Sequence, residues 1–342
     1  MGFISSLKTC GLLGVVGLSF IATGSFASAQ DVTCAEGERQ FEHSLGTLCI
    51  PETVERVVAL EWSLVEALLA VGIQPVGVAD IEGYNAWVKI PVTLDETVPD
   101  VGTRQEPNLE LIATLNPDLI LAAESRVVNN YEALNAIAPT MTFNPYPVDM
   151  ASQYDDMLNS FRNIAAAVNR EEEAETVLAD MEAYFDAVAE VVTEAELATN
   201  TFVIAQTFPA GDVPAFRLFT DNALAVQVLQ RIGLENIWDA PIELYGFTQG
   251  DIEPLADIPD TNFFYVAQAD FNDLLVALPL WQAHPAVAAG HAYWLGGDVW
   301  FFGGPLSAEV LVETILNSLG IEPPVLDVEA TPEVTPEVTP AS

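Results

Sequence analysis

Basic residues are scarce in this chain of 342 residues. Ten lysines and arginines stand against 50 aspartates and glutamates, which gives a formal net charge of −40 at pH 7. Nucleic acid is excluded as a partner, because binding phosphates requires the opposite charge. Since 51% of the residues are hydrophobic, the chain can still form a sizeable core, and the acidic charge is expected on a solvated surface.

Histidines and catalytic motifs are also few. His43 lies in the predicted hairpin, while His284 and His291 lie in a turn bounded by proline and glycine, with no carboxylate at ligand spacing. We therefore expect no metal held by protein side chains. No Walker loop, G-x-S-x-G elbow or G-x-G-x-x-G follows a predicted strand. The many carboxylates include no pair that stands out as an acid-base couple, which leaves an exported enzyme as an open alternative.

The N-terminus has the pattern of an export signal. Lys8 precedes an apolar run, Cys10–Ala22, that is too short to cross a bilayer. Ala27 and Ala29 are the small residues that a signal peptidase reads, so we expect residues 1–29 to be removed, with cleavage after Ala29. The alternative is a retained membrane anchor. The mature chain is expected in the periplasm.

Removal of the signal would leave two cysteines, Cys34 and Cys49. In an exported protein, two cysteines this close in sequence are usually bridged, so we predict a disulfide that staples an N-terminal hairpin. Closing a loop this short would contribute about 3 kcal/mol of stability. Two free thiols or a metal pair are the alternatives, although no further cysteine or suitably spaced histidine supports a metal.

Predicted strands and helices alternate along most of the mature chain, which favours parallel βαβ units. Residues 150–196 contain neither glycine nor proline and keep apolar residues at helical spacing, which predicts a long helical stretch. We therefore expect an α/β fold with two α/β lobes joined by one long helix. The alternating segments are Arg56–Leu60, Ser63–Val71, Val76–Ala79, Leu109–Leu115, Asp118–Ala122, Thr201–Gln206, Ala223–Ile232, Ile252–Leu255, Phe263–Ala267, Leu274–Leu280, Tyr293–Leu295 and Ala308–Leu319.

These patterns also define domain boundaries. The N-terminal lobe with its hairpin is expected at residues 30–165, the interdomain helix at 166–196 and the C-terminal lobe at 197–323. Beyond them, the Thr-Pro-Glu-Val repeat places a proline at every fourth position and has too little apolar mass for a core, so residues 324–342 are predicted to be a disordered tail.

Arginines and aromatic residues occur where turns of the chain should meet at a cleft. Ligands of open α/β sheets bind beyond the carboxyl ends of the strands. Three consecutive bulky aromatics beside glycines cannot all face one core, so we expect some of them in a pocket. The candidate ligand-binding residues are Trp87, Arg104, Arg126, Tyr245, Trp300, Phe301 and Phe302. For Arg104, the alternative is a surface ion pair with Glu106 or Glu110.

A series of segments between about residue 50 and about residue 320 resembles a known family. The segments are Arg56–Gly72, Gly77–Asp80, Tyr84–Val88, Asp100–Glu110, Tyr245–Thr248, Asp251–Ala256, Pro279–Ala283 and Trp300–Ala308. Together they resemble periplasmic binding proteins that serve ferric siderophore ABC importers, and within these the ferric hydroxamate, or ferrichrome-binding, branch.

The resemblance implies a bilobed fold with a rigid interdomain helix and a shallow cleft for an iron(III)-siderophore of hydroxamate or citrate-hydroxamate type. The siderophore's own oxygens saturate the iron, so no cofactor is expected and iron is carried only as the siderophore complex. Arg104 would then hydrogen-bond the iron-bound oxygens, between aromatic walls. The chain would work as a monomer with an inner-membrane ABC permease and its cytoplasmic ATPase, docking through Glu132 and Glu253.

Two positions depart from the pattern of the branch. Arg126 replaces a tyrosine in a loop with a one-residue insertion, and Tyr245 replaces a tryptophan. A second cation in the pocket favours a ligand that carries a carboxylate. A binding component for cobalamin or haem is the alternative within the same fold.

Overall fold

The computed structural model of the protein describes residues 33–146, 152–210 and 213–326. The predicted signal peptide, residues 1–29, and residues 327–342 of the predicted tail lie outside the described residues. Within the described part of the chain, no helix has both the length and the apolar composition needed to cross a membrane.

The first lobe is built on a four-stranded parallel sheet with the order β4-β3-β5-β6. Every residue of these strands is buried, because helices cover both faces. This arrangement confirms the predicted βαβ units. The elements are β3 (Val57–Ala59), α1 (Trp62–Ala70), β4 (Gly77–Val78), α2 (Ile81–Trp87), α3 (Leu109–Thr114), β5 (Leu119–Ala123), α4 (Glu124–Val127), α5 (Tyr131–Asn135) and β6 (Thr140–Phe143).

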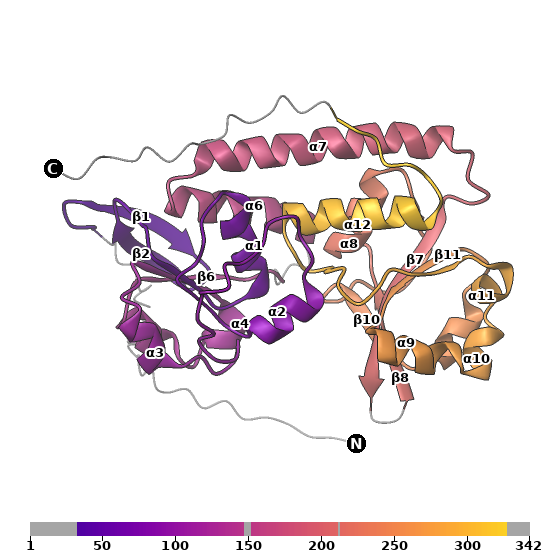
Figure 1. Ribbon diagram of the computed structural model, residues 1–342, viewed down its shortest axis with the longest axis horizontal. Helices are drawn as coiled ribbons and strands as arrows, with labels where there is room; N and C mark the ends of the chain where they lie inside the picture. Colours follow the sequence, from indigo (N-terminus) through magenta and orange to yellow (C-terminus); the bar gives the residue numbers. More distant parts are fainter. Residues whose placement is uncertain (1–32, 147–151, 211–212, 327–342) are drawn as a thin grey trace, which may run out of the picture. The chain divides into compact units, whose positions relative to one another are not determined.

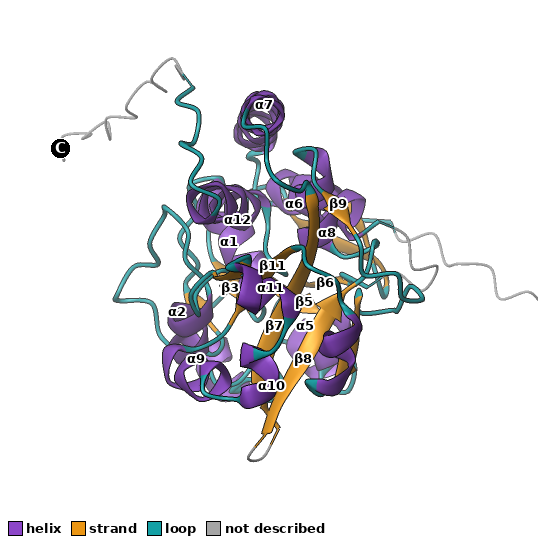
Figure 2. Cartoon of the chain, turned by 90° about the vertical axis from the view of Figure 1, so that its right-hand side faces the viewer, coloured by secondary structure: helices purple, strands orange, loops and turns teal. Residues whose placement is uncertain are grey.

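The second lobe contains a six-stranded mixed sheet with the order β10-β8-β7-β11-β12, in which β9 also pairs with β7. Strands β7, β11 and β12 are parallel, whereas β8 runs antiparallel to both β7 and β10, so the expectation of parallel units holds for only part of this sheet. Figure 2 looks onto this lobe, with the long strand β8 in front. The strands are β7 (Thr201–Ala210), β8 (Val213–Phe219), β9 (Glu235–Asn236), β10 (Phe247–Gly250), β11 (Asn262–Val266) and β12 (Ala292–Trp294).

The helices of the second lobe occur between and after these strands. They are α8 (Leu224–Arg231), the 3-10 helix η1 (Glu253–Asp257), α9 (Ala269–Val276), α10 (Pro279–Gln282), α11 (Pro285–Ala289) and α12 (Pro305–Ser318). Phe263, Phe271 and Trp281 belong to the apolar cluster on one side of the sheet, while the other side joins the core shared with the first lobe.

The long helical stretch consists of two helices, α6 (Gln153–Ala167) and α7 (Glu171–Glu194). Helix α7 corresponds to the predicted interdomain helix over residues 166–196 and is shorter at both ends. Asn169 adopts a left-handed conformation with φ 57°, and the Arg170 amide donates to the Ala165 carbonyl at 2.8 Å. This is the geometry that ends a helix at a left-handed residue. Asparagine tolerates that conformation, so the break needs neither glycine nor proline.

A layer of helices that belongs to both lobes contains the main core. In Figure 1, α7 extends above both lobes, with α6, α1, α12 and α8 beneath it. Leu68 of α1, Phe161 of α6, Phe185 of α7, Leu229 of α8 and Leu311 of α12 belong to one apolar cluster. Because this cluster is continuous, a rotation of one lobe against the other would expose apolar surface.

A buried carboxylate ties the two lobes within that layer. Glu66 of α1 accepts hydrogen bonds from the Ser307 amide at 2.7 Å and the Ser307 hydroxyl at 2.6 Å, at the N-terminus of α12. Burial raises the pKa of Glu66, while its hydrogen bonds oppose the rise. A Cβ on Gly303 would lie 2.6 Å from the Glu66 Oε2 atom, so glycine is required there. Glu66 therefore takes the place of the missing side-chain cap of α12.

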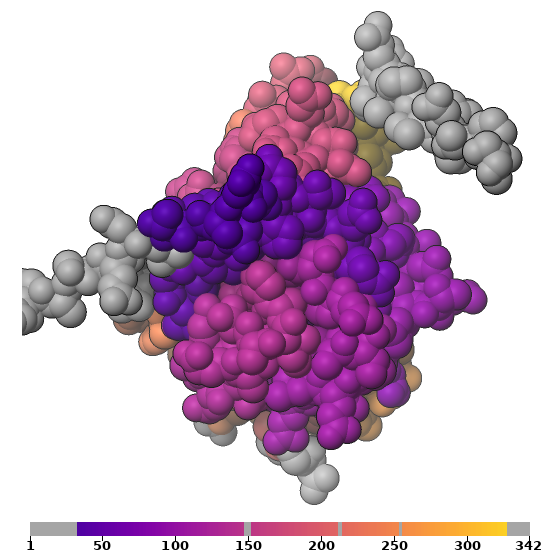
Figure 3. All heavy atoms as spheres, turned by 90° about the vertical axis from the view of Figure 1, so that its left-hand side faces the viewer, coloured from indigo at the N-terminus to yellow at the C-terminus, as the bar shows by residue number. Residues whose placement is uncertain are grey.

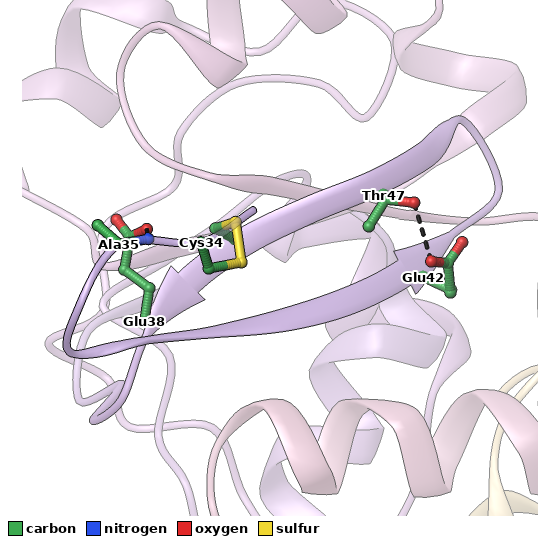
Figure 4. The surroundings of a disulfide bond; sticks show 6 residues. Cys34, Ala35, Glu38, Glu42 and Thr47 are labelled. Carbon is green, nitrogen blue, oxygen red and sulfur yellow. Dashed lines mark hydrogen bonds between the residues drawn. A yellow bond between two sulfur atoms is a disulfide. The ribbon is translucent and has the colours of Figure 1, made fainter. Parts of the chain in front are cut away.

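The N-terminal hairpin consists of β1 (Glu38–His43) and β2 (Gly46–Pro51), and Cys34 is bridged to Cys49. Figure 4 shows Cys34 near Glu38, and the Thr47 hydroxyl donates to Glu42 across the hairpin at 2.8 Å. Arg39 donates to the carbonyls of Ala166 and Ala167 at the end of α6. In Figure 3 the hairpin, in indigo, lies in the upper part of the first lobe.

Glu309 of α12 generates a prediction about pH. Burial, with Asp180 and Glu66 adding to the effect, raises the pKa of Glu309 from 4.5 to about 7. The folded state therefore holds this proton more tightly than the unfolded state, and the protein loses stability as the pH rises from 4.5 to about 7. We expect Glu309→Gln to raise the free energy of unfolding at pH 8, because glutamine has no carboxylate to ionise in this partly buried place. Solvent screening of the partly exposed side chain limits the expected gain to about 1 to 2 kcal/mol.

The measurement is urea unfolding of both proteins at pH 5 and pH 8. Glu313→Gln, on the exposed side of the same helix, is the matched control. A gain for Glu309→Gln that is equal at the two pH values would contradict the assigned titration.

Candidate ligand-binding site

Three charged side chains follow the carboxyl ends of neighbouring parallel strands in the first lobe. Glu61 comes two residues after the end of β3 and is the N-cap of α1, where its side chain accepts from the Trp62 amide. Arg104 lies on the loop between α2 and α3, shortly after Asp100, which forms a parallel bridge with Val78 of β4. Arg126 lies in α4, directly after β5. Because β3 lies between β4 and β5 in the sheet, Glu61 lies between the two arginines.

Glu61 forms ion pairs with both arginines. Its Oε1 atom accepts from Arg104 Nη1 at 2.7 Å, and its Oε2 atom accepts from Arg126 Nε. The exposed fractions of the side chains are 12% for Glu61, 14% for Arg104 and 29% for Arg126, so water screens this cluster only in part. Neither Glu106 nor Glu110, the surface partners considered from the sequence, forms an ion pair with Arg104 in the described structure.

The position of Arg104 is also set by contacts outside the Glu61 pair. Its guanidinium carbon lies 3.5 Å from the centre of the Trp62 ring, a cation-π contact. Its Nε atom is 3.3 Å from Asp80 Oδ2, which is an ion-pair distance without hydrogen-bond geometry. Trp62 is held in turn, because its indole nitrogen donates to the Asp80 carbonyl at 3.1 Å.

The backbone around Arg104 depends on two residues with positive φ. Gly102 has φ 99°, and a Cβ there would lie 3.0 Å from the Glu106 carbonyl oxygen, so the turn requires glycine. Asp80 has φ 60°, and its amide donates to the Gly102 carbonyl at 2.8 Å. Aspartate is among the few residues that tolerate this conformation. The loop that carries Arg104 is thereby anchored to the end of β4.

The charged cluster faces a pocket of about 590 Å³ between the two lobes. Helix α6 contributes apolar and polar lining, the first lobe contributes the charged cluster, and the second lobe contributes aromatic rings. Among the lining residues are Glu61, Leu64, Arg104, Arg126, Phe143, Tyr146, Asp156, Met157, Phe161, Arg217, Tyr245, Phe247, Gln249, Trp300 and Phe302.

Aromatic rings form the wall from the second lobe. Tyr245, which is 51% exposed, stacks on Phe247 with ring centres 6.2 Å apart. Phe302 lies edge-on to Trp300 at 5.2 Å, and Trp300 lies edge-on to Trp62 of the first lobe at 5.1 Å. The rings therefore support one another across the boundary between the lobes, and they offer flat apolar surface to a ligand.

Most of the residues predicted to bind a ligand meet at this pocket. Arg104, Arg126, Tyr245, Trp300 and Phe302 all line it.

Two of the predicted residues do not line the pocket. Phe301 is 3% exposed and packs against Phe219, because successive side chains of this loop point in different directions. Trp87 lies behind Trp300, at a ring distance of 6.4 Å. Both side chains pack against other aromatic rings in this structure, and a binding role for either one stays a prediction.

The prediction missed other lining residues, above all Glu61, Tyr146 and Arg217. Glu61 is one of 50 acidic residues, and no local pattern separates it from the rest. Arg217 lies on β8, a strand that was not predicted, although Phe216, Leu218 and the arginine between them follow the period-two pattern of a strand. That alternation was the available signal.

The electrostatics of the pocket favour a ligand with negative or oxygen-rich groups. Three arginines, Arg104, Arg126 and Arg217, line it against two carboxylates, Glu61 and Asp156. Burial raises the pKa of Tyr146 to about 12, with Glu61 adding to the rise and Arg126 and Arg217 opposing it. Tyr146 is therefore a neutral hydroxyl at physiological pH.

Possible metal ligands come close together at one place among the described residues. One group of three possible ligands, Cys34, Glu38 and Cys49, lies close together, but its two cysteines are bonded to each other. His43 bonds Thr142, and His291 pairs with Asp260, both away from the pocket lining. The arrangement is suited to holding a bulky ligand through rings and arginines.

The chain belongs to the periplasmic binding protein family, whose model matches residues 57–299. It is 34% identical to the iron(3+)-hydroxamate-binding protein FhuD of Escherichia coli over 273 residues, which cover 78% of this chain and 87% of that protein. It is 27% identical to the Fe(3+)-citrate-binding protein YfmC of Bacillus subtilis, covering 92% and 98% of the two chains.

A solved structure agrees with these relatives. The fold is similar to that of the siderophore-binding protein FhuD of Vibrio cholerae with Fe3+-Desferal bound, with a TM-score of 0.71 and 29% identity over 78% of this chain and 98% of that one. This similarity confirms the predicted fold class, two α/β lobes joined through a long helix.

The Glu61 cluster generates a prediction about stability. Glu61→Gln would leave two partly buried guanidinium groups without their shared carboxylate, so we expect the free energy of unfolding to fall by roughly 2 kcal/mol. Urea unfolding at pH 7 measures the loss. Glu106→Gln is the matched control, because Glu106 is exposed and makes no ion pair with Arg104 in the described structure. Equal losses in the two variants would contradict the central role of Glu61.

Proposed function

We propose that this protein is the solute-binding component of an ABC importer and captures an iron(III)-siderophore of hydroxamate or citrate-hydroxamate type. The observation that carries the proposal is the pocket itself, where Arg104 and Arg126 meet opposite a wall of Tyr245, Trp300 and Phe302. A forked guanidinium suits the paired oxygens around chelated iron, and flat rings bury an organic scaffold at little entropic cost.

The size and chemistry of the pocket support this cargo. Its volume of about 590 Å³ lies within the range of roughly 300–1,000 Å³ of small-molecule sites. The siderophore supplies all the oxygens that iron needs, so the protein has to recognise only the organic shell. The named ligands of relatives point the same way, since they include iron(3+)-hydroxamate and Fe(3+)-citrate.

Haem is the alternative cargo that the site disfavours most directly. Haem iron is usually held by an axial histidine, cysteine, methionine or tyrosine. None of the described histidines lines the pocket. Met157, Tyr146 and Tyr245 do line it. The pKa of about 12 opposes the tyrosinate form of Tyr146, so Met157 and Tyr245 are the side chains left as axial ligands. Cobalamin brings its own metal ligands, so a binding experiment is needed to distinguish it from a siderophore as the cargo.

Ligand binding can be measured by the quenching of tryptophan fluorescence, because Trp300 lines the pocket and touches Trp62. We expect ferric complexes from a panel of ferrichrome, ferrioxamine B and ferric aerobactin to quench it, and Arg104→Ala to weaken the binding at least tenfold through the loss of charge-assisted hydrogen bonds. Arg162→Ala, which removes a surface pair with Glu175, is the control.

Haem and cyanocobalamin belong in the same titration. Binding of either one, with no response to any ferric siderophore, would refute the proposal. Native mass spectrometry of the loaded protein confirms the bound mass.

The cellular setting is also part of the proposal. The chain would be exported by residues 1–29, cleaved after Ala29 and held in the periplasm, where it delivers its ligand as a monomer to an inner-membrane permease with a cytoplasmic ATPase. Glu132 and Glu253 would contact that permease, one from each lobe. Glu132 is exposed in the first turn of α5. Glu253 begins η1, and its side chain lies outside the described residues.

Charge reversal tests the docking proposal. We expect Glu132→Arg with Glu253→Arg to lower uptake of radiolabelled ferric siderophore by cells at least tenfold, because both contacts with basic permease residues become repulsive. Siderophore affinity of the purified variant should be retained. The control reverses Glu172 and Glu190, two exposed residues of α7. Normal uptake by the docking variant, or an equal loss in the control, would contradict the assignment.

A further inference from the structure

Arg217 differs from the other two arginines of the pocket in its ion pairing. Arg104 pairs with Glu61 and Asp80, and Arg126 pairs with Glu61, so carboxylates of the protein already offset these charges. Arg217 forms no ion pair with any described residue, although it is half-buried and lines the pocket. The unpaired cation of the pocket is therefore in the second lobe.

The side chain of Arg217 is nevertheless held in place. Its Nη1 atom donates to Gln206 Oε1 at 2.8 Å. The guanidinium carbon lies 4.8 Å from the ring centre of Phe208 and 5.0 Å from that of Phe247. Its Nε atom is buried and has no hydrogen-bond partner among the described residues. A charge in such a position is costly unless an anion joins it, because part of its hydration is lost.

The register of the sheet places amide groups on either side of Arg217. Residue 217 of β8 pairs with Gln206 of β7 and with Gln249 of β10. Directly opposed residues of antiparallel strands lie on the same face of a sheet. Gln249 also lines the pocket, so a guanidinium and an amide, both of them donors, lie side by side on this wall.

We propose that Arg217 and Gln249 form a subsite for a free carboxylate of the ligand, and that the cargo is a ferric siderophore with a carboxylate that does not coordinate iron. The inference rests on the proposed function and narrows it to one substrate class. A planar fork of N–H donors matches a carboxylate, and the neighbouring amide adds a further donor. The ligand carboxylate is thus assigned to Arg217 and not to Arg126, because Arg126 already forms an ion pair with Glu61.

The test compares two ferric citrate-dihydroxamates with the same iron-binding groups. Aerobactin carries two peripheral carboxylates, and arthrobactin is the same skeleton without them. We expect the wild-type protein to bind ferric aerobactin at least tenfold more tightly, measured by fluorescence quenching. In Arg217→Gln, the loss of affinity for ferric aerobactin should be at least tenfold larger than the loss for ferric arthrobactin. Arg217→Lys keeps the charge without the fork of N–H donors, so its affinity for ferric aerobactin should lie between those of the wild-type protein and Arg217→Gln.

Arg231→Gln is the matched control, because it removes a surface arginine of the same lobe that pairs with Glu182 and Asp186. Equal losses for both complexes in Arg217→Gln would overturn the subsite. If that variant does not fold, the wild-type preference decides, and equal affinities for the two complexes would overturn the inference. A wild-type protein that binds neither complex would overturn the inference as well. The proposed function stands in both cases if another ferric siderophore of the panel binds, and it is refuted if none of them does.

Discussion

The apolar core shared by the two sheets is the constraint on which the binding site depends. One wall of the pocket comes from the ends of β3, β4 and β5, and the other from β8, β10 and the loop before α12. The distance between these walls is constant only if the two lobes do not move relative to each other. The helical layer beneath α7 belongs to both lobes, and Glu66 of α1 caps α12 within it. The pocket is thus formed in advance, and ligand binding needs little reorganisation.

The charges at the site follow from the same geometry. Parallel strands deliver Glu61, Arg104 and Arg126 to one edge, where a single carboxylate holds two like charges close together. Without it, the arginines would repel each other and turn toward water. Glu61 lowers the net charge of the pocket but fixes where each N–H donor points. Recognition by this cluster therefore depends on directed hydrogen bonds more than on attraction at a distance.

The fold class follows from the sequence because strand and helix periodicities are local properties. Where the predictions were wrong, the deciding interaction was distant or subtle. The helix break at Asn169 depends on one left-handed residue. Strand β8 forms because it pairs with β7 and β10, and so Arg217 was not recognised. Arg104 was identified through its place before a helix, whereas its partner Glu61 lies 43 residues away and becomes visible only when the sheet is assembled.

The scarcity of positive charge has a kinetic consequence. Three of the ten basic residues line one pocket, whereas only two of the 50 acidic residues, Glu61 and Asp156, do so among the described residues. An anionic chelate would therefore be repelled during its approach and attracted only inside the cleft. Salt screens charges separated by more than roughly 8 Å at physiological ionic strength, so it weakens the distant repulsion more than the contact with Arg217. Encounter with such a ligand would become faster as salinity rises, the opposite of electrostatic steering.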